Sequence, residues 1–551
     1  MKKILIIGGV AGGAAAAARL RRLDETAEII LFERGEHISF ANCGLPYYIG
    51  GTIAEQENLL VQSPAGFKRR FNVDVRTKNT VVAIDRSQKS VTVQDGRSND
   101  TYTERYDKLI LAPGAAPIRP PLPGLNDPRV FSLRDIADAE NIKNFIREQK
   151  PQRAAIIGGG FIGMEMAENL SALGMDVSVI EMAEQVIAPL DADLACDVHR
   201  HLVEQGVSLY LGNALEEIST VDDGLLIKLS QATLAADMVV LAIGVRPENQ
   251  LAKDCGLSLG ERGHILCDAH MRTSDPDIYA AGDAVEVVDF VTGQKAAIPL
   301  AGPAAKQGRI AADNICGIPS AYDGTQGSAI IKVFDLCVAT TGVNEKTARR
   351  LGLNYDKIFL WLPGHAGYYP GTHFMSMKVI FEKSDGRILG AQIVGTDGVD
   401  KRMDILAMAV RLKLTAQQLT QLELCYAPPY SSAKDPVNMA GYVIENCLAG
   451  RLQQFHWDAL DTLPRDGSVT LLDVRSPQEV NMGRVAGFVN IPVDELRGRL
   501  PELDPAKPVY ALCHSGLRSY VAARILAQNG FDVYSLGGGY RLYAAVKRVC
   551  C

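Results

Sequence analysis

The chain has 551 residues, of which 47% are hydrophobic and 22% are charged, and its formal net charge at pH 7 is -7. This length exceeds what one hydrophobic core supports, so we expect about three or four domains of roughly 150 residues each. The acidic balance argues against nucleic acid as a partner, and no apolar run reaches the length that spans a membrane. Eleven cysteines without paired spacing, and a glycine turn too close to the N-terminus for a signal peptide, favour a cytoplasmic location.

The first predicted element is an apolar strand over residues 3–7, followed by a glycine-rich turn and an alanine-rich helix over residues 14–23. The turn reads GGVAGG at residues 8–13. The next strand ends at Glu33, at about the spacing at which an acid meets the ribose in a dinucleotide-binding unit. Val10 replaces the middle glycine of the G-x-G-x-x-G pattern, so an unrelated strand-to-helix turn is the alternative.

Cys43 stands in the run SFANCGLPYY at residues 39–48. A flavoprotein disulfide reductase would normally carry a second cysteine at position 48, which is Tyr48 here. A single sulfur cannot close an internal disulfide, so its oxidised form pairs with a small thiol or is a sulfenic acid. The choice between these two forms largely decides the substrate.

A second glycine-rich turn, GGGFIG at residues 158–163, matches the G-x-G-x-x-G pattern in full. Its glycines allow the backbone to approach a pyrophosphate, and the following helix, which is predicted to end at Leu173, directs amide donors at that group. The next strand ends at Glu181. This acid can accept a hydrogen bond from a ribose 2′-hydroxyl and would repel a 2′-phosphate, which favours NADH over NADPH. The alternative is that Glu181 only ends the strand and does not bind the ribose.

Three further segments resemble parts of the flavoproteins that have two dinucleotide-binding domains. The run TSDPDIYAAGD at residues 273–283 resembles the later flavin motif, whose final aspartate holds the ribityl chain of FAD. The runs at residues 111–114 and 241–247 resemble the crossings between the FAD and NAD domains. The resemblance implies that the first turn binds FAD and the second binds NAD. The residues that it assigns to the two cofactors together are Gly8, Gly9, Ala11, Gly12, Glu33, Arg34, Gly114, Asp283, Ala301, Gly158, Gly160, Ile162, Gly163, Glu165, Glu181 and Gly244.

The residues around Cys43 resemble the single-cysteine branch of the pyridine nucleotide-disulfide oxidoreductases, which contains NADH oxidases, NADH peroxidases and coenzyme A-disulfide reductases. In the oxidases and peroxidases a histidine of the first glycine turn lies beside a sulfenic acid, but this turn carries Val10 and Ala11. The resemblance therefore favours coenzyme A chemistry. The residues that the resemblance assigns to coenzyme A are Arg19, Arg22, Ser39, Asn42 and Lys434. For Arg19 and Arg22, on the helix after the first glycine turn, a solvated basic face is the alternative.

The runs HAGYYPG at residues 365–371 and CYAPPYSSAKD at residues 425–435 resemble the dimerisation domain of coenzyme A-disulfide reductases. In that family two tyrosines of the partner subunit reach the active sulfur, and a phenol can protonate a leaving thiolate. We assign these roles to Tyr368 and Tyr426, with Tyr369 and Tyr430 as alternatives; buried aromatic packing is the other interpretation. The resemblance implies a homodimer whose active site is shared between the subunits.

The pattern changes after residue 447. A buried strand over residues 471–475, the run GFVNIP at residues 487–492 and a strand over residues 509–512 precede the loop CHSGLR at residues 513–518, which opens a helix predicted over residues 519–529. This order resembles a single-domain rhodanese. A cysteine between a strand end and a helix N-terminus faces backbone N–H groups, which stabilise its thiolate and persulfide. Cys513 and Arg518 are therefore the predicted catalytic pair, and a buried structural cysteine is the alternative.

The sequence thus predicts an α/β chain with two Rossmann-like dinucleotide-binding domains, an α+β dimerisation domain and a C-terminal α/β rhodanese domain. The predicted bounds are 1–112 with 245–322 for the FAD-binding domain, 113–244 for the NAD-binding domain, 323–447 for the dimerisation domain, 448–460 for a linker and 461–551 for the rhodanese domain. Cys550 and Cys551 end the chain as a vicinal pair, which either accepts sulfur or is an incidental tail.

The predicted function is NADH-driven and FAD-dependent reduction of persulfides, polysulfides or coenzyme A persulfide. Cys43 would form a mixed disulfide with coenzyme A, and Cys513 would carry sulfane sulfur. Reduction of coenzyme A disulfide for thiol homeostasis is one alternative, and a flavin-bound sulfur sensor is another. The remaining cysteines lack metal-ligand spacing, so no metal site is predicted, and neither a nucleic acid nor a membrane is an expected partner.

Overall fold

The computed structural model describes the backbone of residues 2–550 and the side chains of residues 2–547, so Cys551 and the side chain of Cys550 lie outside the description. The chain divides into two compact units. The first comprises Met1–Glu184 and Gly206–Gly327, and the second comprises Gln185–Gln205 and Ser328–Cys551. Within the described residues, no helix is long and apolar enough to cross a membrane.

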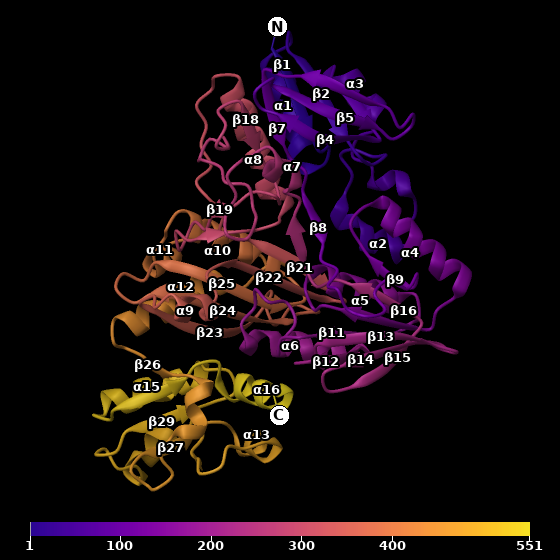
Figure 1. Ribbon diagram of the computed structural model, residues 1–551. Coiled ribbons are helices and arrows are strands. Elements are labelled where there is room, and N and C mark those ends of the chain that lie inside the picture. The colour runs from indigo at the N-terminus through magenta and orange to yellow at the C-terminus, as the bar shows by residue number, and fades with distance from the viewer. Residues whose placement is uncertain (1, 551) are drawn as a thin grey trace. The chain divides into compact units, whose positions relative to one another are not determined.

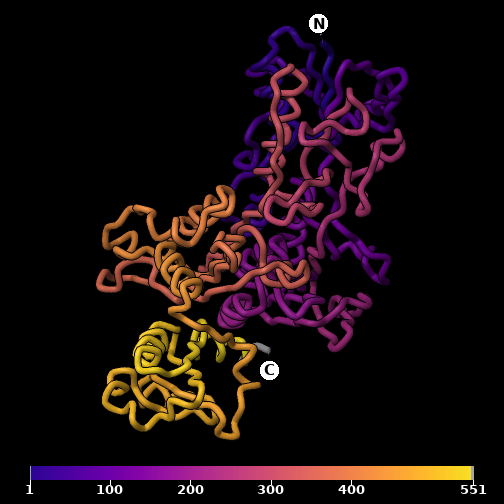
Figure 2. The backbone as a smooth tube through the Cα atoms, turned by 90° about the vertical axis from the view of Figure 1, so that its left-hand side faces the viewer, coloured from indigo at the N-terminus to yellow at the C-terminus, as the bar shows by residue number. Residues whose placement is uncertain are grey.

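The N-terminal sheet of the first unit has five parallel strands in the order β18-β7-β1-β2-β3. The central strands are apolar and buried on both faces, as in sheets that helices cover on both sides. Strands β7 and β18 pair although they are far apart in the chain, and Figure 2 shows the indigo N-terminal trace beside the rose trace of residues 245–320. The strands are β1 (Lys3–Ile7), β2 (Glu28–Glu33), β3 (Asp74–Thr77), β7 (Lys108–Leu111) and β18 (Ile278–Ala280).

Two helices pack closely beside this sheet, α1 (Ala11–Leu23) and α8 (Ala301–Ile315). A Cβ at Gly308 would lie 2.2 Å from the carbonyl oxygen of Gly12, so the two backbones are in direct contact. Helix α1 begins at Ala11, three positions before the predicted start. The last two glycines of the turn, Gly12 and Gly13, therefore lie in the helix, and a Cβ at Gly13 would lie 1.8 Å from the carbonyl oxygen of Gly8.

The second sheet of this unit is also parallel, in the order β12-β11-β10-β16-β9. It repeats the local plan of the first sheet, since a glycine turn again joins a buried strand to a helix and the next strand returns beside the first. Its elements are β9 (Val130–Ser132), α4 (Ile136–Gln149), β10 (Arg153–Ile157), α5 (Phe161–Ala172), β11 (Asp176–Glu181), β12 (Ser208–Leu211) and β16 (Met238–Leu241).

Small antiparallel sheets and short helices complete the first unit. The three-stranded sheets are β4-β5-β6 and β13-β14-β15, and β8 pairs with β17 and β19 with β20. Their bounds are β4 (Asn79–Asp85), β5 (Ser90–Asp95), β6 (Thr101–Arg105), β8 (Ala115–Pro117), β13 (Leu215–Val221), β14 (Gly224–Leu229), β15 (Thr233–Ala236), β17 (Val245–Pro247), β19 (Val287–Val288) and β20 (Lys295–Ala296). The short helices are η1 (Asn42–Gly44), α2 (Leu45–Ile49), η2 (Gln56–Leu59), α3 (Pro64–Phe71) and α7 (Gln250–Asp254).

The second unit contains an antiparallel sheet in the order β21-β22-β25-β24-β23. Helix α10 packs on β22 and β25, and α6 packs on β25; Figure 1 shows α10 above this sheet and α6 below it. The elements are α6 (Ala192–Glu204), β21 (Ala329–Val333), β22 (Leu336–Gly342), α9 (Glu345–Arg350), β23 (Tyr355–Pro363), β24 (Phe374–Glu382), β25 (Ile388–Gly395), α10 (Val399–Arg411), α11 (Ala416–Thr420) and α12 (Pro436–Leu448).

The C-terminal part of the second unit is a parallel sheet in the order β26-β30-β29-β27-β28 with helices around it. Helix α15 begins at Leu517, two positions before the predicted start, because Gly516 adopts φ +107° and starts the helix. The elements are β26 (Gln453–Phe455), η3 (Trp457–Thr462), β27 (Thr470–Asp473), α13 (Pro477–Met482), β28 (Val489–Asn490), α14 (Leu496–Arg499), η4 (Leu500–Glu502), β29 (Val509–Leu512), α15 (Leu517–Gln528), β30 (Val533–Leu536) and α16 (Gly539–Cys550).

A buried ion cluster explains why residues 185–205 belong to the second unit. The ammonium of Lys378, which is fully buried in β24, contacts the carboxylates of Asp191 (3.0 Å), Asp193 (2.8 Å) and Glu345 (2.6 Å). Lys357 adds a second cation at 2.5 Å from Glu345. A buried charge is strongly destabilising without its partner of opposite charge. The cluster therefore attaches the start of α6 to the sheet.

Candidate active sites

The first glycine-rich turn lies between β1 and α1. Gly8 has φ +98°, and a Cβ there would lie 2.0 Å from the carbonyl oxygen of Ala112, so only glycine fits. Glu33, at the end of β2, accepts a hydrogen bond from the N–H of Gly9 at 2.8 Å. Val10, which precedes α1, contributes no capping side chain. The first amides of α1 therefore suit an anion such as a pyrophosphate.

The second turn, between β10 and α5, has the same construction. Gly158 has φ +112°, and a Cβ there would lie 2.4 Å from the carbonyl oxygen of Ala242. Glu181, at the end of β11, accepts from the N–H of Gly159 at 2.7 Å. Gly160 provides no cap for α5, and a Cβ there would meet nothing within 4 Å, so the space over this turn is open. Both acids therefore hold the glycine turn itself.

The other residues predicted to bind the cofactors lie in loops and at element ends. Gly114 and Gly244 have φ +74° and φ +111°, which only glycine adopts readily. Burial raises the pKa of Asp283 above its usual value. Arg34 pairs with Glu248 at 3.0 Å. Ala301 is the first residue of α8.

Cys43 lies in the 3-10 turn η1, directly before α2, and is exposed. The pKa of its thiol is raised, first by desolvation of the sulfur and then by the negative charges of Glu165 and Asp283. Tyr47 donates a hydrogen bond to Glu165. Burial and the neighbouring Glu168 raise the pKa of Glu165 to about 7. A carboxyl group that changes protonation near neutral pH thus acts electrostatically on the sulfur.

Tyr48 occupies the position of the missing second cysteine and is 6% exposed. Its hydroxyl donates to the carboxylate of Glu140 in α4, and the ammonium of Lys143 lies 3.5 Å from its ring centre. Position 48 therefore joins the cysteine-bearing segment to the second dinucleotide-binding part through packing and charge.

Some of the residues predicted to hold coenzyme A already have partners within the protein, and others are exposed. Ser39 has φ +48°, and its N–H donates to the first glycine turn at 2.8 Å. Arg19 pairs with Asp313 of α8 at 2.6 Å. The guanidinium of Arg22 lies 6.0 Å from the ring centre of Phe71, and Asn42 is exposed beside Cys43.

In the second unit, the fold brings together the two predicted tyrosines. The hydroxyl oxygens of Tyr368 and Tyr426 lie 2.7 Å apart, and the residues are 75% and 49% exposed. The loop that carries Tyr426 is anchored at its end by Asp435, whose buried carboxylate pairs with Arg402 at 2.9 Å. Lys434 is exposed next to this anchor. The two phenols are thus exposed on an anchored loop surface, where a molecule that covers this surface would contact them.

Cys513 follows β29 and is 1% exposed. The N–H of Gly516 points at its Sγ at 3.1 Å, and the hydroxyl of Ser519 lies 3.4 Å from the same atom. Arg518 makes a bidentate ion pair with Glu479, and this charge holds the pKa of Glu479 at about 2. The sulfur therefore accepts a hydrogen bond from a backbone N–H at the N-terminus of α15, which is the kind of environment that the loop pattern predicted.

Three family models match this chain in succession. They are the pyridine nucleotide-disulphide oxidoreductase over residues 2–308, the dimerisation domain of the same family over residues 328–436, and the rhodanese-like domain over residues 456–545. The chain belongs to the pyridine nucleotide-disulphide oxidoreductase family. It is a flavoprotein oxidoreductase with a C-terminal rhodanese domain, and the predicted fold class is confirmed.

Two solved structures resemble this oxidoreductase over nearly its whole length. The reduced CoADR-RHD of Bacillus anthracis is 49% identical with a TM-score of 0.97, covering 99% of this chain and 98% of that one. The NAD-dependent persulfide reductase of A. fulgidus is 39% identical with a TM-score of 0.91, covering 98% and 100%. The coenzyme A disulfide reductase of Staphylococcus haemolyticus is 35% identical over 80% of this chain and 99% of the relative.

Membership of this family implies FAD and a pyridine nucleotide, and the two glycine turns fit such groups. Each turn excludes a Cβ on the sheet side, where Gly8 and Gly158 meet backbone, and each leads into a helix without a capping side chain. That arrangement leaves amide donors for two pyrophosphates. Among the described residues, no group of histidine, cysteine, aspartate and glutamate side chains gathers as a metal site would.

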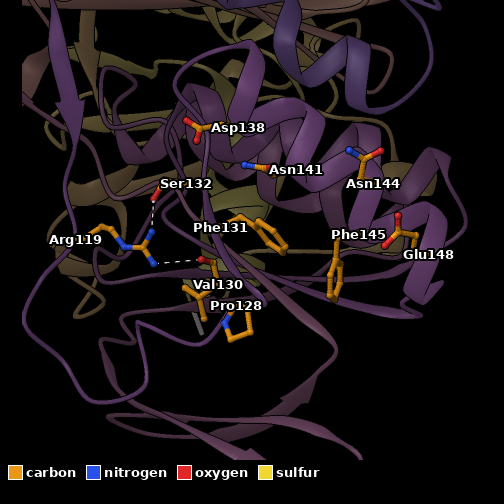
Figure 3. A pocket seen from close by; sticks show the side chains of 10 residues that line it. All are labelled: Arg119, Pro128, Val130, Phe131, Ser132, Asp138, Asn141, Asn144, Phe145 and Glu148. Atoms are coloured by element: carbon orange, nitrogen blue, oxygen red, sulfur yellow. Dashed lines mark hydrogen bonds between the residues drawn. The ribbon is translucent and has the colours of Figure 1, made fainter. Parts of the chain in front are cut away.

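A cleft of about 460 Å³ lies between β9 and α4 of the oxidoreductase (Figure 3). It is distinct from the predicted sites, because none of the predicted site residues lines it. Arg119 at its edge donates to the carbonyl oxygens of Leu125 (2.6 Å) and Val130 (3.2 Å), so this cation is already satisfied by the backbone.

The sequence reasoning missed several partners of the predicted site residues. Tyr47 contacts Glu165, and its place shortly after Cys43 was a signal that could have found it. Glu479 contacts Arg518, and its signal was the capping pattern Ser476-Pro477-Gln478-Glu479 at a helix start. Trp361 contacts the rhodanese loop from the dimerisation domain. No local pattern signals that contact, because it joins residues more than 150 positions apart.

Proposed function

We propose that this oxidoreductase uses NADH to reduce persulfides, that Cys43 is its redox sulfur, and that coenzyme A is the thiol that pairs with Cys43. The observation that carries the proposal is the hydrogen bond at Cys513, where the N–H of Gly516 points at Sγ at 3.1 Å at the start of α15. A backbone N–H at a helix N-terminus stabilises an anionic persulfide, and the same chain carries a reductase motif with a single cysteine. The likeness to the persulfide reductase of A. fulgidus supports the same conclusion.

The two glycine turns would hold the cofactors, with the first turn and Asp283 at FAD and the second turn at NADH. Bound FAD would supply two-electron transfer from NADH to a disulfide at Cys43. Glu181 favours NADH because the residues that follow it, Met182, Ala183 and Glu184, bring no cation for a 2′-phosphate.

Cys43 would act as the nucleophile. Its thiolate attacks the sulfur of a persulfide R–S–SH that carries the R group, the S–S bond breaks, and hydrosulfide leaves with the bonding electron pair. Cys43–S–S–R forms, and two electrons then return it to the Cys43 thiolate and R–S⁻. With coenzyme A as R–SH, the exposed Asn42 and the neighbouring Ser39 would contact it, together with Arg19, Arg22 and Lys434. The partly buried carboxyl of Glu165 would buffer the charge beside the sulfur.

The exposed tyrosine pair supports a shared active site. Tyr368 and Tyr426 are joined by a hydrogen bond of 2.7 Å on the surface of a domain that the family uses for dimerisation. We infer that the two phenols of one subunit reach Cys43 of the other and protonate the departing thiolate. The active oxidoreductase would then be a homodimer.

The deciding experiment compares two substrates under anaerobic conditions. Coenzyme A persulfide should drive NADH oxidation at least about 10-fold faster than coenzyme A disulfide at equal concentration, which is about 1.4 kcal/mol in the barrier, and one sulfide should be released per NADH. Faster turnover of the disulfide would contradict the proposal.

Reduction of coenzyme A disulfide is the second candidate. The 35% identity to the coenzyme A disulfide reductase of Staphylococcus haemolyticus favours it, since the match covers 99% of that relative. In this case the rhodanese domain would act independently, and a Cys513→Ser variant would keep full reductase activity with protein-bound as well as free persulfides.

A further inference from the structure

One face of strand β23 carries residues that contact the rhodanese domain. Alternate residues of a strand share a face, and here Phe359 and Trp361 both meet the rhodanese loops. Phe359 is 6% exposed and packs against the glycine loop before α16, where a Cβ at Gly538 would lie 3.2 Å from its own Cβ. Trp361 meets the ring of His514 edge-on, with ring centres 5.5 Å apart and an angle of 71°. The dimerisation sheet therefore supports the loop that follows Cys513.

Trp361 is itself held on two sides. Its ring stacks on Phe374 of the neighbouring strand β24 with centres 4.0 Å apart, and the guanidinium of Arg541 lies 5.1 Å from its ring centre. Arg541 also donates to both carboxylate oxygens of Asp197 in α6, at 2.9 and 3.0 Å. The indole thus has one defined orientation toward the rhodanese loop.

The catalytic loop is tied to the same arginine through its backbone. The carbonyl of His514 accepts from the N–H of Arg541 at 3.0 Å, and the carbonyl of Cys513 accepts from the N–H of Tyr540 at 2.8 Å. Burial lowers the pKa of His514, so its ring packs on Trp361 in the neutral form near pH 7. Movement of the indole would therefore be transmitted to the two residues at the start of the loop.

We propose that Trp361, a residue of the dimerisation domain, is a positioning residue of the rhodanese site. Through His514 it fixes the loop that directs the N–H of Gly516 at the sulfur of Cys513. The inference rests on the proposed function in one respect, namely that Cys513 carries sulfane sulfur.

The reaction that depends on this geometry is sulfur transfer. The Cys513 thiolate attacks the outer sulfur of thiosulfate, the S–S bond of the donor breaks, and sulfite leaves with the bonding electron pair. The resulting Cys513 persulfide then gives its outer sulfur to cyanide, which forms thiocyanate and restores the thiolate. The persulfide anion is stabilised while the N–H of Gly516 points at it, and a small displacement of such a donor slows a reaction strongly.

The test uses the full chain with its cofactors and compares three substitutions. Trp361→Leu removes the ring, and Trp361→Phe keeps an aromatic edge for His514. Trp457→Phe changes the other indole of the chain, which donates to Asp193 at 3.4 Å, and serves as the control. We expect Trp361→Leu to lower kcat for thiosulfate-to-cyanide transfer about 10-fold with little change in KM for thiosulfate. Trp361→Phe and Trp457→Phe should stay within about threefold of the unsubstituted protein.

Two controls separate positioning from unfolding and from a failure of the proposed function. NADH oxidation with coenzyme A disulfide should stay within about twofold in every Trp361 variant, since this activity does not use Cys513. If Cys513→Ser keeps sulfur transfer, the proposed role of Cys513 fails. If Cys513→Ser loses transfer while Trp361→Leu keeps it, only the role of Trp361 fails.

Fluorescence gives a direct readout, because the chain has only two tryptophans, Trp361 at the contact with His514 and Trp457 at Asp193. In Trp457→Phe the remaining indole is Trp361, so loading Cys513 with sulfur from thiosulfate should change its emission. The same variant with Cys513→Ser should show no change. Unchanged emission on loading of Cys513 would show that the ring does not sense the loop, and would overturn the inference.

Discussion

The guanidinium of Arg518 donates hydrogen bonds to both carboxylate oxygens of Glu479, at 2.7 and 2.6 Å. Glu479 also closes the capping box at the start of α13, where it accepts from the N–H of Ser476 at 3.0 Å. One carboxylate therefore fixes both the start of a helix and the arginine of the Cys513 loop. Glu479 therefore fixes the orientation of the positively charged guanidinium of Arg518.

The first prediction concerns Glu479→Gln. Glutamine still completes a capping box, so α13 should remain intact, but the charge that orients Arg518 is lost. We expect kcat/KM for thiosulfate-to-cyanide transfer to fall about 10-fold, or about 1.4 kcal/mol, with NADH-driven reduction of coenzyme A disulfide unchanged. Glu502→Gln, at an exposed ion pair with Arg499 in the same domain, is the matched control. Equal rates in the two variants would show that Arg518 needs no partner.

The second prediction separates the two sulfurs. Cys43→Ser should retain FAD, measured by its absorbance, and lose NADH-driven reduction of both coenzyme A persulfide and coenzyme A disulfide. It should keep thiosulfate-to-cyanide transfer, whereas Cys513→Ser should show the opposite pattern with free small substrates. Residual reductase activity above about 1% in Cys43→Ser would identify a different nucleophile.

The third prediction concerns the tyrosine pair. Tyr368→Phe and Tyr426→Phe should each lower kcat for persulfide reduction about 10-fold, and the double variant should lose little more, because the two hydroxyls act through one hydrogen bond. Tyr430→Phe tests the alternative assignment. Independent, multiplying effects of Tyr368 and Tyr426 would contradict a paired role.

The pKa of Tyr368 is raised by its hydrogen bond to Tyr426. The phenol should therefore stay protonated to a higher pH than an ordinary tyrosine. Removal of its partner in Tyr426→Phe should move the alkaline limit of kcat to lower pH, which a pH profile of NADH oxidation measures.

The fourth prediction concerns the buried ion cluster. Lys378→Met leaves the carboxylates of Asp191, Asp193 and Glu345 without their central cation, which costs about 3 to 5 kcal/mol. For a unit of this size we expect the midpoint of thermal unfolding to fall by about 10 °C. Lys383→Met, at an exposed position after β24, is the control and should leave the midpoint unchanged.

The same cluster predicts how stability depends on pH. Lys378 lowers the pKa of Asp191 and of Glu345 below their usual values. A carboxyl whose pKa is depressed by folding stabilises the folded state at pH values above its ordinary pKa, and this contribution is lost as the pH falls through the folded value. Thermal scans between about pH 5 and pH 3 should show a steep loss of stability, and Lys378→Met should flatten it. A parallel slope in that variant would contradict the role of the cluster.

The fifth prediction concerns the choice of nicotinamide cofactor. Glu181→Ser removes a negative charge beside the second glycine turn, so the ratio of kcat/KM for NADPH to that for NADH should rise at least about 10-fold, or about 1.4 kcal/mol. Glu184→Ser, three residues later, serves as the control, since the carboxylate of Glu184 lies beside Gly212. An unchanged ratio in Glu181→Ser would mean that the acid only braces the turn through Gly159.

Much of the fold and of the candidate site follows from local sequence, because the informative interactions there are local. A glycine at position 8 or 158 is required by a turn that leaves no room for a Cβ, and an acid at 33 or 181 ends the strand beside that turn. The loop from Cys513 to Arg518 likewise carries its own donors within six residues. These short-range patterns predicted the α/β fold class, the flavoprotein family and the rhodanese domain, all of which the family models confirm.

The contacts that join distant segments could not be predicted in this way. Position 48 was recognised only as a missing cysteine, and the fold shows that Tyr48 ties α2 to α4 through Glu140. Arg19 is predicted to bind coenzyme A, and the fold shows its ion pair with Asp313, which follows it by nearly 300 positions. Such pairs depend on which elements the tertiary fold places side by side, and no spacing in the chain encodes them.

The sequence by itself predicted the family and the two candidate sulfurs, because the signals around Cys43 and Cys513 each lie within a few residues of the chain. Tertiary structure alone decided how the parts are held. It assigned residues 185–205 to the second unit through Lys378, and it set Trp361 of the dimerisation sheet against the rhodanese loop. The physical reason is burial: a buried charge needs its partners and an aromatic ring needs a packed surface, and the chain supplies both from segments that only folding brings together.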